Sequence, residues 1–218
     1  MTKRQLTAFT TTSIINVSFA VILNIWDASV FETYLGDIDP VLGLLLASSL
    51  GYLSVRHLVN EKIGEIYGSD YLKSLKTSTL FAVCFGAVII MSDFTGIFPG
   101  DINVPYPKCL IFYPVMGYIV EVIFHLLPIT LLYLVGKGEN RSFYLVALLE
   151  PVYQSGIGGV STVNNWAFVF VFVHILLINL AQLRVFKKFG FISMYGIRLV
   201  YYLIWHEIWG IIRLDLLF

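Results

Sequence analysis

Long apolar stretches separated by short polar segments are the dominant pattern along the chain. A bilayer core about 30 Å thick is crossed by roughly 20 apolar residues in a helix, and seven stretches reach or approach that length. The predicted spans are residues 8–30, 41–59, 78–95, 109–135, 143–160, 165–183 and 192–212. The pattern therefore predicts an all-α, polytopic transmembrane helical bundle of about seven spans, with residues 1–218 forming a single integral membrane domain.

The composition agrees with this pattern. The chain is 58% hydrophobic and 13% charged, whereas a soluble domain is about 45–50% apolar and about 25% charged. The formal net charge is +0, so no basic surface for nucleic acid is indicated. We expect a multi-pass protein of the cell membrane, with membrane lipids around it and no nucleic-acid partner.

Lys and Arg residues gather in the segments on one side of the predicted membrane. If the N-terminus lies inside, twelve of the 14 Lys and Arg residues fall on the inner side and two, Lys108 and Arg213, on the outer side. Cytoplasmic loops carry such an excess. The N-terminus is therefore predicted inside and the C-terminus outside. In this count Arg198 lies near the inner end of the last span.

Ionisable side chains interrupt the apolar spans at matching depths. Span four contains Glu121 and His125, while Glu150, His174 and His206 lie in spans five, six and seven. A charge at the bilayer centre costs about 2.5–3.5 kcal/mol, so such residues face the bundle interior and mark functional sites. At ~1.5 Å rise per residue the first four fall near the midplane and His206 nearer the outer face. We therefore expect one buried site, with interhelical hydrogen bonding as the alternative role for each residue.

Helical spacing adds supporting residues to this site. Glu121 and His125 are four residues apart and share one helical face, as do Glu150 and Gln154. Three residues of the last span, Arg198, Tyr202 and His206, follow one another at intervals of four and form a single stripe. Gln154, Tyr202 and Arg198 are thus candidate partners of the buried Glu and His residues.

Three short motifs in the last third of the chain resemble those of a known family. The sequence has LEPVYQS at 149–155, FVFVH at 170–174 and HEIWG at 206–210. These are similar to the EExxxR, FxxxH and final His motifs of the CAAX prenyl protease and bacteriocin-processing (abortive-infection-type) intramembrane glutamic proteases. The resemblance covers about residues 149–210. It implies an intramembrane endopeptidase that hydrolyses a membrane-embedded or lipid-linked peptide, with Glu150, His174 and His206 as catalytic residues and no cofactor.

Three positions depart from the family pattern. Leu149 stands where the family has its first Glu, Gln154 replaces the Arg, and Gly210 replaces the Asn that follows the last His. Three interpretations stay open. Glu150 acts as the base, Glu121 supplies the missing carboxylate from span four, or the chain is a relative that has lost its activity.

Hydrolysis needs a base for water and donors for the oxyanion. In the expected mechanism Glu150 and His174 orient and deprotonate a water, and His206 donates to the oxyanion with Tyr202 nearby. Glu121 and His125, in span four, would hold the catalytic residues in place without touching the substrate, or would relay protons.

Other functions use the same residues differently. Carboxylates and imidazoles suit zinc or iron, so a metal-dependent membrane enzyme is one alternative; its ligands would come from Glu121, His125, Glu150, His174 and His206. A proton-coupled carrier is another, because Glu and His chains relay protons in membranes. The last alternative is a catalytically inactive membrane scaffold.

Overall fold

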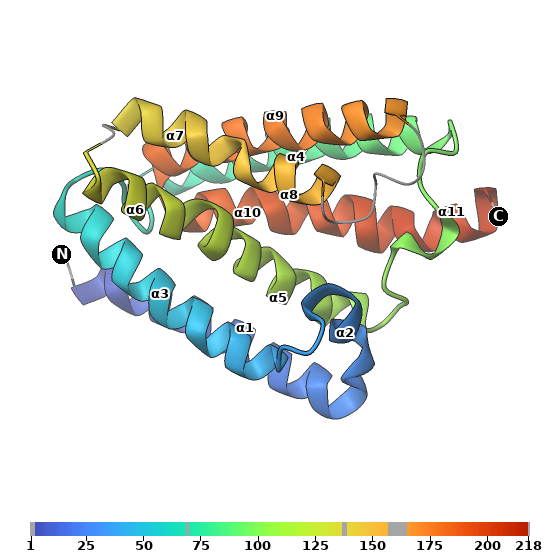
Figure 1. Ribbon diagram of the computed structural model, residues 1–218, viewed down its shortest axis with the longest axis horizontal. Helices are drawn as coiled ribbons and strands as arrows, with labels where there is room; N and C mark the ends of the chain where they lie inside the picture. The colour runs from blue at the N-terminus through green and yellow to red at the C-terminus, as the bar shows by residue number, and fades with distance from the viewer. Residues whose placement is uncertain (1–2, 69, 137–138, 157–164, 218) are drawn as a thin grey trace.

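Helices make up almost all of the described chain, in an all-α membrane bundle (Figure 1). The computed structural model describes residues 3–68, 70–136, 139–156 and 165–217. Within them, five helical rods are long and apolar enough to cross a membrane. They are α1 (Lys3–Asp27), α3 (Pro40–Asn60), α4 (Tyr71–Asp93), the continuous rod of α5 (Cys109–Val120), η2 (Glu121–Leu126) and α6 (Leu127–Leu134), and α9 (Asn165–Phe189).

Shorter helices and one long final rod complete the described fold. The short elements are α2 (Ser29–Leu35), the 3-10 turn η1 (Gly100–Ile102), α7 (Glu139–Ala147) and α8 (Leu149–Gly156). The final rod runs without a break through α10 (Phe191–Tyr202), η4 (Leu203–Ile208) and α11 (Trp209–Leu217). Both η2 and η4 are π-helical turns, and each carries one of the histidines singled out above.

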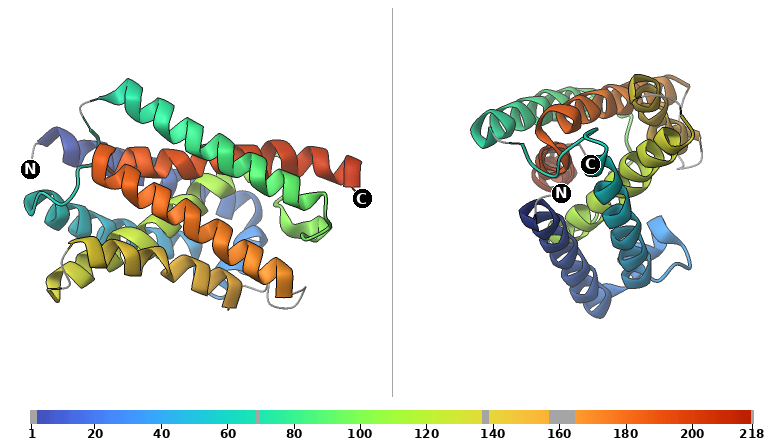
Figure 2. Two further views of the ribbon diagram at one scale, coloured as in Figure 1. Left: turned by 90° about the horizontal axis from the view of Figure 1, so that it is seen from above. Right: turned by 90° about the vertical axis from the view of Figure 1, so that its left-hand side faces the viewer.

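The rods pack in two groups joined through α5 and α10. α4 lies with α9 and α10 on one side, and α1 lies with α3 and α5 on the other (Figure 2). The N-terminal and C-terminal ends of the chain lie at opposite ends of the bundle (Figure 1). The polar residues discussed below come from α8, α9, α10 and η2, so they lie where the two groups meet.

Large apolar side chains cover much of the outside of the bundle. Exposed examples are Ile25 on α1, Leu46 on α3, Leu80 and Met91 on α4, and Leu177 on α9. A soluble monomer rarely exposes such extensive apolar surface, whereas lipid tails solvate it. The surface therefore agrees with the length and hydropathy of the five rods.

The turn between α9 and α10 requires glycine at position 190. Gly190 has φ +88, and a Cβ there would lie 2.6 Å from the carbonyl oxygen of Glu65. The amides of Phe191 and Ile192 donate to the carbonyls of Glu65 and Ile66 at 2.9 and 2.8 Å. The segment before α4 is thereby bound to the start of α10, the helix that carries Arg198.

The fifth predicted span is wrong as one continuous helix. α7 ends at Ala147 and α8 begins at Leu149, and residues 157–160 of that span lie outside the described residues. Pro151 lacks an N–H, and its ring crowds the carbonyl four residues earlier, which is that of Ala147. Asn179 of α9 donates its Nδ2 hydrogen to this carbonyl oxygen at 3.2 Å. After the break, α8 turns Glu150 inward, 1% exposed, and leaves Leu149 42% exposed.

Other predicted boundaries also shift. α4 begins at Tyr71 rather than 78, because the Asp70 side chain caps it by accepting from the amide of Lys73 at 3.1 Å. The final rod is longer than the predicted span 192–212. It is not among the five candidate spans, because Arg198 and Glu207 interrupt its apolar pattern. The number of seven spans and the inside position of the N-terminus stay predictions.

Candidate functional site

A buried guanidinium lies at the centre of the bundle. Arg198, in the middle of α10, is 4% exposed. Its Nε donates to Glu121 Oε1 at 2.6 Å, and its Nη1 and Nη2 each donate to one carboxylate oxygen of Glu150 at 2.8 Å. A planar guanidinium suits this two-pronged contact with a carboxylate. Arg198, predicted above as a candidate partner of the buried Glu and His residues, thus connects η2 and α8 inside the bundle. Its position near the inner end of the last span stays a prediction.

Glu121 and His125 form the second half of this network. Both lie on η2 and are 0% exposed, and His125 Nδ1 is 2.7 Å from Glu121 Oε2. Gln182 of α9 donates to Glu121 Oε1 and accepts from Arg198 Nη2, the latter at 3.1 Å. Pro128 follows η2 and lacks the N–H that an α-helix would use, which agrees with a locally widened helix. The predicted pairing of Glu121 with His125 on one helical face is confirmed.

Two carboxylates, Glu121 and Glu150, contact the one guanidinium of Arg198. An uncompensated buried charge is costly, so both carboxylates depend on Arg198 and on their other hydrogen bonds. His125 Nδ1 contacts the Glu121 oxygen that does not accept from Arg198.

Glu150 is held on both of its oxygens. Besides the two bonds from Arg198, its Oε1 accepts from Gln154 Nε2 at 2.8 Å, so the predicted contact four residues apart on one helix is confirmed. Leu149 faces outward on the same turn of α8. A carboxylate at position 149 would point away from the network, so in this helix Glu150 is the inward-facing acid.

A cavity of about 130 Å³ adjoins the Arg198–Glu150 pair. At roughly 30 Å³ per liquid water it holds a few water molecules. Its polar wall consists of Glu150, Gln154, His174, Arg198, Tyr201, Tyr202 and His206, and its apolar wall of Ile89, Phe98, Ile102, Val171, Ile175, Ile178 and Trp205. The structure thus brings Glu150, His174 and His206 to one cavity. Glu121 and His125 do not line it and connect to it through Arg198.

His174 is fixed mainly by aromatic rings. Its ring stacks on Phe170, four residues earlier, at 5.6 Å between centroids and 16°, and meets Phe85 of α4 edge-on at 5.8 Å. Its Nε2 is 3.2 Å from the hydroxyl of Tyr201. The FxxxH spacing therefore places Phe170 as a platform for the imidazole, and Tyr201 is the polar partner that the sequence analysis did not name.

His206 is held by one hydrogen bond and by the rings of two tyrosines. Its Nδ1 is 2.6 Å from Oδ1 of Asn103, which follows η1. Its ring stacks on Tyr113 of α5 at 4.2 Å and 16°, and Tyr202 meets it edge-on at 5.0 Å. Gly210, one turn further, lies against the Asn103 side chain, because a Cβ at 210 would be 3.0 Å from Asn103 Nδ2.

The metal alternative is not supported by this arrangement. Among the described residues, no group of three or more His, Cys, Asp and Glu side chains is placed to hold a metal ion. The physical reason is that Arg198 lies between Glu121 and Glu150 and takes the position that a cation would need. The zinc or iron ligand set considered above is therefore not assembled.

A second buried ion pair joins α4 to α11. Arg213 of α11 contacts both carboxylate oxygens of Asp93 at 2.7 and 2.8 Å. Its Nη1 donates to the carbonyl of Pro99 at 2.9 Å and its Nη2 to that of Phe98 at 3.1 Å. This Asp93–Arg213 clamp holds the segment that leads to η1. The side chain of Arg213, one residue past the last predicted span, is fully buried, and its position on the outer side stays a prediction.

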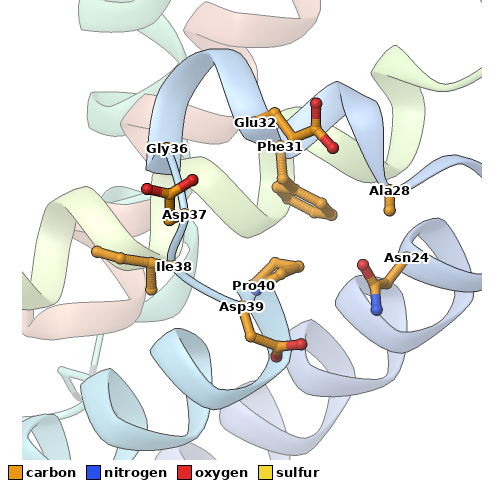
Figure 3. A pocket seen from close by; sticks show the side chains of 9 residues that line it. All are labelled: Asn24, Ala28, Phe31, Glu32, Gly36, Asp37, Ile38, Asp39 and Pro40. Carbon is orange, nitrogen blue, oxygen red and sulfur yellow. The ribbon is translucent and has the colours of Figure 1, made fainter.

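A larger, open cavity of about 430 Å³ lies between α1, α2 and α3 (Figure 3). Three carboxylates line it, but Figure 3 shows Glu32, Asp37 and Asp39 pointing in different directions. Asp39 already accepts from the amides of Val41 and Leu42 as the cap of α3. This cavity therefore has no converging polar groups like those around Arg198.

Several residues of the site escaped the sequence analysis. Gln182 and Asn179 are amides within a long apolar stretch, and a polar residue in such a place is itself a signal of interhelical bonding. Asn103 and Tyr113 offered no signal, because a turn-rich segment and one more aromatic residue are common in this chain.

No protein-family model, curated protein or solved structure matches this chain. The established description is therefore that of a multi-pass helical membrane protein with a buried cluster of Glu, His and Arg residues around one internal cavity.

Proposed function

We propose that this protein is an intramembrane hydrolase that cleaves a membrane-embedded or lipid-linked peptide at the cavity beside Arg198. The observation that carries the proposal is the wall of this cavity, where the carboxylate of Glu150 and the imidazoles of His174 and His206 meet in an otherwise apolar bundle. The resemblance to the glutamic intramembrane proteases supports the substrate class.

The contacts suggest a division of roles. Glu150 accepts three hydrogen bonds, two of them from a guanidinium, and these hold its carboxylate in one orientation. Its role is to orient the water, and a histidine accepts the proton. The hydroxyl of Tyr202 lies on the same wall, accepts from Arg198 Nη1 at 3.4 Å, and supplies its own hydrogen as a donor for the oxyanion.

The reaction balances without a cofactor. The water oxygen forms a bond to the peptide carbonyl carbon while its proton passes to an imidazole. The C–N bond then breaks as the leaving nitrogen takes that proton. The cavity supplies groups for each of these transfers.

The test uses the purified protein in lipid nanodiscs and two probes, an S-farnesylated peptide with a C-terminal tripeptide and a synthetic transmembrane peptide. Mass spectrometry detects products that have gained one water. We expect wild-type cleavage of at least one probe, and a loss of roughly 10²-fold or more in Glu150→Gln. Glu207→Gln is the matched control, because Glu207 is buried on the same rod as His206 but does not line the cavity. Equal cleavage by wild type and Glu150→Gln would contradict the proposal.

One observation favours a second candidate, the inactive membrane scaffold. Arg198 occupies both oxygens of Glu150 and one of Glu121, as a purely structural ion-pair network would. This candidate predicts no cleavage of either probe by the wild type, and a cellular phenotype that Glu150→Gln leaves intact.

A further inference from the structure

The ring of His206 is held on one face, at one edge and at one nitrogen. Tyr113 covers one face, Tyr202 meets the ring edge-on, and Nδ1 is bound to Asn103 Oδ1 at 2.6 Å. The other nitrogen, Nε2, has no hydrogen-bond partner within the part of the chain that the structure describes. His206 lines the cavity, and Nε2 is its polar atom left for a bound molecule.

The partners of Asn103 decide where the His206 proton lies. The amide of Val104 donates to the Tyr113 hydroxyl oxygen at 2.9 Å, which leaves the phenol hydrogen to point at Asn103 Oδ1, 3.5 Å away. A carboxamide oxygen only accepts, so Nδ1 of His206 must carry the hydrogen of that contact. A neutral imidazole has one N–H. Its Nε2 then presents a lone pair.

Two features of the fold keep Asn103 in this position. Gly210 leaves the space that the Asn103 side chain fills, since a Cβ at 210 would lie 3.0 Å from Nδ2 and 3.2 Å from Cγ. The Asp93–Arg213 clamp binds the carbonyls of Phe98 and Pro99, just before η1. The segment carrying Asn103 is thus held to the rod that carries His206.

We propose that Asn103 is a positioning residue that holds the His206 proton on Nδ1 and turns the Nε2 lone pair to the cavity, which makes His206 the proton acceptor of the site. This inference rests on the proposed hydrolase function for its chemistry. The water proton passes to Nε2 as the oxygen attacks, and the imidazolium returns it to the leaving nitrogen. His206 is then a base and not the oxyanion donor that the family motif led us to expect.

The direct test is the tautomer of His206, measured without substrate. The protein is labelled with ¹⁵N-histidine and placed in nanodiscs, and NMR spectra are recorded at a pH above the ordinary imidazole pKa of about 6.5. The His206 signals are assigned from their loss in His206→Gln. We expect the wild-type ring to carry its proton on Nδ1. Asn103→Leu and Gly210→Ala should shift most of the population to the Nε2–H form, while Asn103→Asp should retain the Nδ1–H form.

Gly196→Ala is the matched control, because the same substitution in the same rod meets nothing within 4 Å and should leave the tautomer unchanged. A wild-type ring protonated on Nε2, or a tautomer that Asn103→Leu does not alter, would overturn the inference.

Cleavage of the farnesylated or transmembrane probe separates this inference from the proposed function. If both hold, Asn103→Leu lowers kcat by roughly 10²-fold with little change in KM, and Asn103→Asp restores most of it. If the tautomer depends on Asn103 but the protein cleaves neither probe, the positioning role of Asn103 stands and the proposed hydrolase function is contradicted. Full cleavage by an Asn103→Leu protein with the shifted tautomer would remove His206 as the proton acceptor.

Discussion

Arg198 is the residue on which the polar interior depends. Its five N–H donors reach two carboxylates, an amide and the hydroxyl of Tyr202 in the buried interior of the bundle. Replacing one partner of a buried pair leaves an uncompensated charge, which is far more costly than removing both partners. The same residue explains why Glu121 and Glu150 can stand so close to each other.

Arg198→Leu should therefore lower the free energy of unfolding by about 3–5 kcal/mol. This loss of stability is measured by unfolding the protein with sodium dodecyl sulfate in mixed micelles. The double variant Arg198→Leu with Glu150→Leu should lose less than the sum of the two single variants, because the pair is coupled. Arg184→Leu, at an exposed position of α9, is the control and should change stability by no more than about 0.5 kcal/mol. Strict additivity would show that the Arg198–Glu150 contact contributes nothing.

Among the elements, the segment between α4 and α5 forms part of the cavity wall. Phe98 and Ile102 line the cavity from this segment, and Asn103 follows it. The Asp93–Arg213 clamp holds it by a buried ion pair, whereas Lys108 and Asp27 form an ion pair with side chains 30% and 27% exposed. Buried and exposed pairs contribute very differently to stability.

Arg213→Met should speed amide hydrogen exchange in residues 94–103, because it removes the donors to the Phe98 and Pro99 carbonyls and leaves Asp93 unpaired. Exchange is followed by mass spectrometry in nanodiscs. Lys108→Met breaks the exposed pair, which is worth about 0–1 kcal/mol, and should leave exchange in 94–103 close to wild type. Equal exchange in Arg213→Met and wild type would mean that the clamp does not hold this segment.

For the whole molecule, hydropathy and depth predicted much of the arrangement. The matching depths of Glu150, His174 and His206 anticipated that they share a cavity, and spacing anticipated the pairs Glu121–His125 and Glu150–Gln154. Spacing named Arg198 as a candidate partner, but it did not show which carboxylates the guanidinium binds, because Glu121 and Glu150 lie 77 and 48 residues earlier in the chain. The contact of Asn103 with His206 joins residues 103 apart in sequence, and no local pattern encodes it.

The orientation of the bundle is tested by cysteine labelling in intact cells. In a background with Cys84 and Cys109 replaced, Asp37→Cys should react with a membrane-impermeant maleimide, because residue 37 lies in the acidic segment between α2 and α3. Glu61→Cys, at the opposite end of α3, should react only after permeabilisation. Both positions are exposed, so burial cannot explain a difference. The reverse pattern would invert the predicted orientation.

On the proposed function, the buried polar residues form a catalytic site and do more than bind helices to one another. His174→Phe tests it most directly, because a phenylalanine retains the stacking on Phe170 and loses only one hydrogen bond, at 3.2 Å to Tyr201. The measurement is kcat for the cleaved peptide probe in nanodiscs, corrected for the folded fraction. We expect a fall of roughly 10²-fold or more, because His174 helps Glu150 to orient the water and a misplaced water slows the reaction. The free energy of unfolding should stay within about 1.5 kcal/mol of wild type. A kcat unchanged once the folded fraction is taken into account would show that His174 is structural and contradict the site.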